Sequence, residues 1–92
     1  MDITYDSSKD LLNMAKHDVS LREAKNLDWE TLTERPDTRQ NYGEQRFIGY
    51  GLIGARLYCL VFTDRDNQRR IISLRKANPR EVTEYGKAKR IH

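Results

Sequence analysis

The chain has 92 residues, of which 37% are hydrophobic and 34% are charged, and its formal net charge is +3. This size and composition indicate one small domain with a modest core and exclude a membrane span, because no apolar run reaches about 20 residues. The acidic start MDITYDSSKD is not a signal peptide, and the single Cys59 allows no internal disulfide, so we expect a cytoplasmic protein. No Cys/His pair has zinc spacing, so neither a metal nor a cofactor is expected.

Two helices are predicted near the N-terminus, after a short strand over residues 2–6. SSKDLLNMAKH, residues 7–17, predicts a helix whose buried face is formed by Leu11, Leu12 and Ala15. SLREAKNLD, residues 20–28, predicts a second helix. Its apolar residues at i, i+3 and i+6 mark the buried side; they are Leu21, Ala24 and Leu27.

Strand signals dominate the middle of the chain. DWETLTERP predicts a strand that stops at Pro36, and DTRQNYGEQ predicts a polar loop. Three segments rich in β-branched and aromatic residues then predict the main strands, which are RFIGYGLI (46–53), RLYCLVFT (56–63) and RIISLRK (70–76). Gly54 and Ala55 suit a two-residue hairpin turn, whereas DRDNQR suggests a longer loop.

A final helix is expected from Pro79, with Asn78 as its cap and Glu81 three residues later. Its inward residues would be Val82, Tyr85 and Ala88. The tail over residues 86–92 is expected to fray. The order of elements predicts an α+β domain over residues 1–92, with N-terminal helices packed on a small antiparallel β-sheet and a C-terminal helix.

The predicted turns also predict which residues face one another across the sheet. The first hairpin would pair Ile48 with Val61 and Tyr50 with Cys59, and the second would pair Cys59 with Leu74. We expect this apolar face to lie against the N-terminal helices. The opposite face would carry Tyr58 beside Arg75, with Gly49 and Gly51 leaving room for a ligand to approach the backbone.

Residues 62–77, FTDRDNQRRIISLRKA, carry the excess charge of the chain. Five basic and two acidic residues give this stretch a net charge of +3, which equals that of the whole protein. For Arg69 and Lys76, a solvated hairpin explains the charge as well as a binding role does. Arg75 lies inside an apolar strand and needs a partner, so an anionic ligand is the favoured interpretation there.

Two further motifs have both a structural and a chemical interpretation. Lys16 and His17 close a helix, where they can stabilise its negative end, although His17 could also transfer a proton. Glu44 and Arg46, in GEQRF, could simply pair with each other. Alternatively, Glu44 could act as a general base and Arg46 as a phosphate ligand.

These stretches, taken in order, resemble a known family. ITYD with NMAKHDVSL, then EQRFIGYG, ARLYCLVFTDR and RRIISLRKA, are similar to the BrnT toxins of bacterial type II toxin–antitoxin systems, which are related to RelE. The resemblance spans about residues 3–85. Asp18 stands where the family usually has Gly, a residue that suits a left-handed helix end.

The resemblance implies a RelE-like fold and an endoribonuclease that halts translation and growth. It implies a BrnA-type antitoxin as partner, a DNA-binding dimer that holds two toxins, so that contact with operator DNA is indirect. We expect a metal-independent reaction in which Arg65 and Arg75 hold the scissile phosphate and Glu44 or His17 serves as base or acid. The expected RNA-binding residues are Lys16, Arg46, Tyr58, Arg69, Arg70, Ser73, Lys76 and Arg80.

Two rival classes stay open at this point. The same basic face would suit a non-catalytic nucleic-acid-binding or operon-repressing module, held by salt-dependent contacts to phosphates. A RelE relative that acts on gyrase rather than on RNA is the other alternative.

Overall fold

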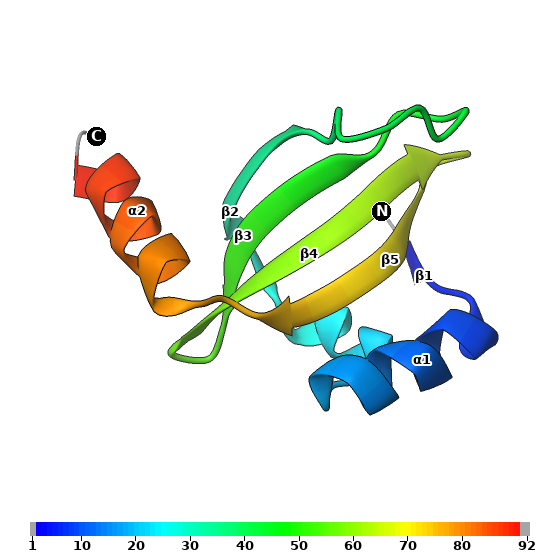
Figure 1. Cartoon of the computed structure of the whole chain (residues 1–92), viewed down its shortest axis with the longest axis horizontal. Coiled ribbons are helices and arrows are strands. Elements are labelled where there is room, and N and C mark those ends of the chain that lie inside the picture. The colour runs from blue at the N-terminus through cyan, green and yellow to red at the C-terminus, as the bar shows by residue number, and fades with distance from the viewer. Residues whose placement is uncertain (1, 91–92) are drawn as a thin grey trace.

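The computed structural model describes residues 2–90, which form a five-stranded sheet with helices at its edge, on one face and at one end (Figure 1). The sheet has the order β1-β5-β4-β3-β2. The elements are β1 (Asp2–Thr4), α1 (Ser7–His17), the 3-10 helix η1 (Leu21–Asn26), β2 (Asp28–Pro36), β3 (Phe47–Ile53), β4 (Arg56–Arg65), β5 (Gln68–Lys76) and α2 (Pro79–Arg90). The α+β class is as predicted, but the sheet is not wholly antiparallel, because β1 pairs parallel to β5.

Both hairpin turns are tight. Gly54 has a φ of 60° in the predicted two-residue turn between β3 and β4. The predicted longer loop between β4 and β5 is instead a two-residue turn at Asp66 and Asn67, whose φ values are 55° and 61°. Two consecutive positive φ angles match the strand twist, so the strands extend as far as Arg65 and Gln68.

A β-bulge in β5 changes the predicted pairing of the second hairpin. Val61 lies opposite Ser73 and Phe62 lies opposite Ile71, so Ile72 has no direct partner on β4. The extra residue shifts the register by one position for the rest of the strand.

The shift reverses the faces predicted for the end of β5. Thr63 lies opposite Arg70 as predicted, but beyond the bulge Cys59 lies opposite Arg75 rather than Leu74. Because successive strand residues point to opposite faces, Arg75 joins the face of Cys59 and Leu74 moves to the other.

The main core lies on the face that was expected to bind a ligand. Leu21 and Ala24 of η1 and the following Leu27 are buried as predicted, but they pack on a different set of strand residues, which is Leu60, Phe62, Ile71 and Leu74. The prediction that the face with Ile48, Cys59 and Val61 meets the N-terminal helices is therefore wrong. That face carries a separate, smaller cluster.

The strand glycines accommodate the core rather than a ligand. A Cβ atom on Gly49 would lie 2.7 Å from Leu32 Cδ1, and one on Gly51 would lie 3.1 Å from Leu27 Cδ2. Two leucines therefore occupy the space that these glycines leave over the backbone.

Helix α1 is fixed to the free edge of β5 through one side chain. β1 covers only residues Gln68 to Arg70 of β5. Farther along that edge, the amide of Asn13 donates to the carbonyl oxygen of Leu74 (2.8 Å) and accepts from its N–H (3.2 Å), as another strand would. Asn13 also donates to the carbonyl of Val19 at 2.9 Å.

This anchor turns α1 the opposite way from the prediction. Asn13 is the buried residue of the helix, whereas Leu11, Leu12 and Ala15 are all exposed. Residues two apart on a helix lie about 200° apart, so a helix that buries Asn13 presents Leu11 and Ala15 to solvent.

Helix α2 begins as predicted and extends away from the sheet (Figure 1). Asn78 Oδ1 accepts from the Glu81 N–H at 2.8 Å, and Glu81 Oε1 accepts from the Asn78 N–H at 2.9 Å, which is a capping box. Tyr85 donates to the carbonyl of Thr31 at 2.6 Å, but Val82 is exposed rather than inward. The predicted frayed tail is helical to residue 90, and residues 91–92 lie outside the described part of the chain.

The bulge predicts which introduced cysteine can reach Cys59. In Arg75→Cys the two residues face each other directly, about 4.5–5.5 Å apart at Cα, which suits a disulfide. We expect mild oxidation to give an intrachain disulfide, identified by mass spectrometry of a non-reducing digest. Leu74→Cys is the matched control and should stay reduced. A disulfide between residues 74 and 59 would instead support the register without a bulge and contradict the structure.

The edge anchor predicts a large loss of stability in Asn13→Ala. The substitution leaves the buried N–H and carbonyl of Leu74 without partners, so the free energy of unfolding should fall by about 2–4 kcal/mol. Asn26→Ala removes one exposed bond to Glu23 and should change it by less than about 0.5 kcal/mol. Urea titration measures both, and equal midpoints for the two variants would show that Asn13 is no anchor.

Candidate functional site

A hollow of about 390 Å³ lies on the face of the sheet opposite η1, bounded by the end of α1 and the start of α2. Its floor is Ile48, Cys59 and Val61. Its border has four cationic side chains and only one carboxylate, that of Glu81. The cationic residues are Lys16, Arg35, Arg39 and Arg75. His17, Tyr50 and Ser73 complete the lining. The arrangement favours an anionic ligand.

Arg75 is held in place by Glu81 at the first turn of α2. Its Nη1 and Nη2 donate to the two carboxylate oxygens at 2.8 and 2.9 Å, and this bidentate pair lowers the pKa of Glu81 to about 2. Tyr50 donates to Glu81 at 2.8 Å, and burial beside this carboxylate raises the pKa of Tyr50 to about 12. The ion pair therefore joins β3, β5 and α2.

One edge of the Arg75 guanidinium is still available to a ligand. Of its five N–H groups, three bond within the chain, two to Glu81 and one to the carbonyl of Lys76. The Nε–H and the second Nη2–H, which form the side edge of the fork, have no partner within residues 2–90. This edge has the geometry that binds two oxygens of a phosphate.

The end of α1 supplies the opposite wall. Asp18 caps the helix in the left-handed conformation, with φ 59° and ψ 33°, the conformation that a Gly at this position would suit. Burial, together with the charges of Lys16 and Arg75, lowers the pKa of His17 below its ordinary value. A neutral imidazole at physiological pH can accept a proton.

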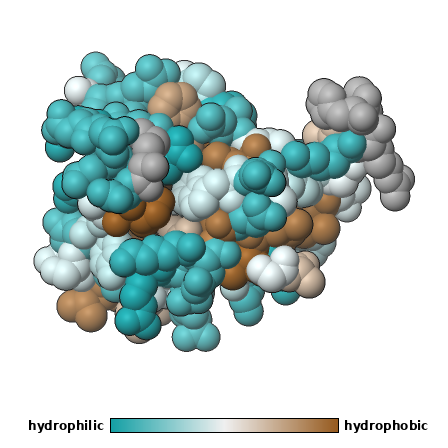
Figure 2. Space-filling view, turned by 180° about the vertical axis from the view of Figure 1, so that it is seen from behind, coloured by the Kyte–Doolittle hydropathy of each residue, from teal (hydrophilic) through white to brown (hydrophobic). Residues whose placement is uncertain are grey.

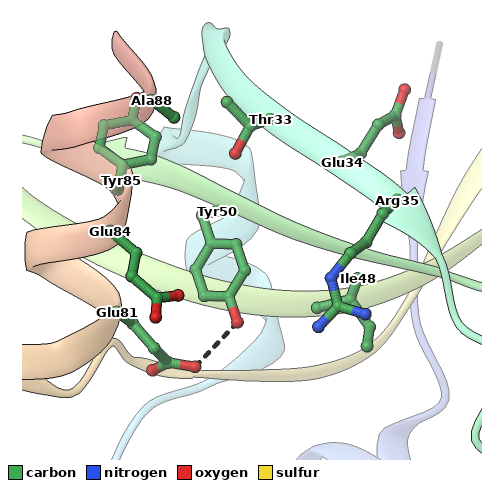
Figure 3. A pocket seen from close by; sticks show the side chains of 9 residues that line it. All are labelled: Thr33, Glu34, Arg35, Ile48, Tyr50, Glu81, Glu84, Tyr85 and Ala88. Atoms are coloured by element: carbon green, nitrogen blue, oxygen red, sulfur yellow. Dashed lines mark hydrogen bonds between the residues drawn. The ribbon is translucent and has the colours of Figure 1, made fainter. Parts of the chain in front are cut away.

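Two arginines of the hollow were missed at the sequence level. Arg35 points from β2 toward Ile48 (Figure 3), and neither Arg35 nor Lys16 takes part in an ion pair within residues 2–90. Arg39 is bound at 2.8 Å by the buried Asp37, and this bond holds the Asp37 pKa well below its usual range. Residues two apart on a strand point to the same face, so the spacing of Thr33 and Arg35 along β2 was the sequence signal that could have placed Arg35 there.

Cys59 is a packing residue of the floor. The side chain is buried, and burial raises its pKa above the ordinary thiol value. A neutral thiol in this position is not a nucleophile.

Several predicted residues lie at the other end of the sheet. Arg65 and Glu44 border a separate hollow beside Thr63. Arg65 is six residues along β4 from Cys59, the partner of Arg75, so about 20 Å separates Arg65 from Arg75. They do not form the joint phosphate clamp that the sequence suggested.

Two more basic residues near that end have partners within the chain. Arg46 lies 3.6 Å from Glu44, without a hydrogen bond to it, and 4.0 Å from the centre of the Tyr42 ring. Arg70 lies 3.7 Å from Asp6, the cap of α1. The proximity of Glu44 matches the structural interpretation of Arg46, and Arg70 lies beside a carboxylate of the helix cap.

The remaining predicted RNA contacts face elsewhere. Tyr58 packs against the main core and lies opposite Lys76, not Arg75. Arg69 bonds to Asp64 at 2.8 and 2.9 Å and covers the rings of Trp29 and Phe62. Arg80 is exposed on α2, 3.6 Å from Glu84. The hollow therefore collects four of the twelve predicted site residues: Lys16, His17, Ser73 and Arg75.

A smaller, more apolar hollow of about 240 Å³ adjoins the first and separates α2 from the sheet (Figure 3). Tyr50, Arg35 and Glu81 border both hollows. Within residues 2–90, no group of three or more His, Cys, Asp or Glu side chains is arranged to hold a metal ion. The helices of this part of the chain are too short and too polar to cross a bilayer.

Comparison with known proteins gives two matches and one negative result. Residues 5–81 match the family described as "Ribonuclease toxin, BrnT, of type II toxin-antitoxin system". The crystal structure of the Brucella abortus ribonuclease toxin BrnT shares the fold, with a TM-score of 0.67 and 23% identity over 85% of this chain and 97% of that one. Curated proteins include no significant match. The family match covers most of the chain, including all the residues that border the basic hollow, and the chain therefore belongs to the BrnT family of ribonuclease toxins.

Proposed function

We propose that this chain is a cytoplasmic, metal-independent endoribonuclease of the RelE-like superfamily, which cleaves RNA and thereby halts translation and growth. The observation that carries the proposal is the basic hollow, which Arg75 borders together with Lys16, His17 and Ser73 while one edge of its guanidinium has no partner within residues 2–90. Four cationic side chains can supply the positive charge that a phosphate requires, so the reaction needs no metal.

Cleavage would use the RNA's own 2′-hydroxyl as nucleophile. The oxygen attacks the adjacent phosphorus, the bond to the 5′-oxygen breaks, and a cyclic phosphate and a 5′-hydroxyl result. His17 in its neutral form takes the proton of the 2′-hydroxyl. Arg75 and Lys16, which border the same hollow, stabilise the charge on the phosphate oxygens, and Lys16 donates a proton to the leaving 5′-oxygen.

Glu81 is a positioning residue in this account. It occupies the end of the guanidinium and leaves the side edge free, so Arg75 is fixed before RNA arrives. Arg35 and Arg39 would bind neighbouring phosphates. Arg65, Glu44, Arg46 and Arg70 lie too far along the sheet for the scissile phosphate and are candidates only for flanking contacts.

The partner would be a BrnA-type antitoxin. Membership of a type II toxin family implies a protein antitoxin. We propose that two copies of this chain bind one DNA-binding antitoxin dimer, so that operator DNA is contacted through the antitoxin. The basic hollow is the surface that we propose such a partner covers.

Arg75→Ala should abolish RNA cleavage and growth arrest. Removing one phosphate donor typically lowers the rate about 10²–10³-fold. Purified protein is incubated with RNA in EDTA, and fragments are resolved on a sequencing gel. Arg69→Ala removes an equally well-bonded arginine from the opposite face and should cleave within about threefold of wild type, with folding of both variants checked by circular dichroism.

Two parallel assays separate the rival functions. RNA that stays intact on the sequencing gel but is retarded on a native gel would identify a non-catalytic binder. Intact RNA, together with trapped DNA breaks in a separate gyrase assay, would identify a gyrase poison. Wild-type cleavage by a folded Arg75→Ala protein would remove Arg75 from the site.

The lowered His17 pKa predicts the pH dependence of cleavage. A base must be unprotonated, so kcat/KM should rise with pH through a pKa below the ordinary histidine value of about 6.5 and stay flat around neutrality. In Lys16→Met a positive neighbour is lost, so the acidic limb should move to higher pH. His17→Ala should lose the limb. A limb unchanged in both variants would assign the base to another group.

A further inference from the structure

The solvent side of α1 is apolar, which is the reverse of an ordinary surface helix. Leu11, Leu12 and Met14 are 71%, 70% and 47% exposed, and Ala15, one turn from Leu11, is also exposed. The only other exposed large hydrophobic residue within the described chain is Val82. We call these four α1 residues the α1 strip. Figure 2 shows apolar side chains at the lower left edge of the molecule, where α1 lies in that view.

The fold itself forces this exposure. Asn13 bonds to the edge of β5 and thereby fixes the rotation of the helix. Leu11 and Ala15 lie about half a turn from Asn13, and Leu12 and Met14 lie about 100° to either side of it, so none of the four reaches the core while that anchor holds. Contiguous exposed apolar side chains bordered by polar residues form a candidate contact surface for another protein.

The α1 strip is continuous with the basic hollow. Leu12 borders a shallow groove of about 230 Å³ together with Lys9, Lys16, His17 and Ser73. The last three of these residues also border the large hollow. A segment that lies along α1 can therefore continue directly over the residues proposed to bind RNA.

The charge beside the strip indicates the chemistry of its occupant. Lys9 and Lys16 flank Leu12 on the side of the groove, and neither takes part in an ion pair within residues 2–90. The carboxylate of Asp10 is turned the other way, because it accepts from Ser20 and from the N–H of Leu21. The surface thus combines an apolar strip with a cationic border.

We propose that the α1 strip is the docking site for a segment of the antitoxin that has apolar anchors and acidic residues. The apolar side chains pack on Leu11 and Met14, and the carboxylates lie over Lys9, Lys16 and Arg75, where they exclude RNA. The proposal rests on the proposed function, since it assigns the partner of that site and the way in which the site is silenced.

The direct test is the double variant Leu11→Ser/Met14→Ser. Neither residue borders the RNA hollow, so cleavage by the free toxin should be unchanged. Calorimetry measures the affinity of the variant for the antitoxin of its own operon. This affinity should fall at least about 30-fold, because the loss of one interface anchor costs about 2 kcal/mol of binding free energy. Val82→Ser is the matched control. Val82 is also apolar and exposed but lies on α2, so this variant should bind the antitoxin with wild-type affinity.

Growth assays separate failure of this proposal from failure of the function. The expected result is that Leu11→Ser/Met14→Ser still arrests growth and is no longer rescued by co-expressed antitoxin. Full rescue of a toxic double variant would overturn the docking site and leave the ribonuclease intact, whereas a wild-type chain that cleaves no RNA would overturn both. If wild type is a dimer by light scattering and the double variant is a monomer with wild-type antitoxin affinity, the strip binds a second copy and the proposal is wrong.

Discussion

The β-bulge at Ile72 is the constraint on which the site depends. β5 contains one extra residue, Ile72. The part of β5 before it pairs with β4 as the sequence predicted, and the part after it is shifted along β4 by one position. The shift directs Leu74 into the main core and Arg75 to the opposite face. Bulges near active sites commonly re-aim a side chain in this way. Without it, Arg75 would lie against the core side of the sheet, away from Lys16 and His17.

Two polar anchors then complete the arrangement around β5. Asn13 joins α1 to the edge of the strand and brings the end of that helix beside Ser73. Glu81 joins α2 to the end of the strand and orients Arg75 from the other side. The basic hollow exists because both helices meet the same short piece of β5. The exposed α1 strip is a consequence of the first anchor, so the proposed docking surface and the basic hollow are both positioned by α1.

The sequence was sufficient for the class of fold and for most elements, because β-branched strands, the apolar spacing of η1 and the Asn78–Glu81 capping box are local signals. It could not reveal the bulge: Ile71 and Ile72 are both apolar, so either register buries an isoleucine. Nor could it reveal the rotation of α1, since periodicity favours burying Leu11 over Asn13, and only the strand edge reverses that preference. Arg35 comes to the hollow through the pairing of β2 with β3, and Arg39 through the loop that follows β2. Arg65 and Arg75 looked adjacent because both flank one hairpin, yet they belong to its opposite ends.

The central claim is that RNA binds the face of the sheet that carries Arg75. Ultraviolet cross-linking of a non-cleavable 2′-O-methyl oligonucleotide, followed by mass spectrometry, tests it directly, because aromatic side chains report both faces. Tyr50 borders the hollow, whereas Tyr58 and Trp29 pack on the core side. The account predicts cross-links to the peptide that contains Tyr50 and their loss in Arg75→Ala. Cross-links concentrated on Tyr58 or Trp29 would place RNA on the opposite face and contradict it.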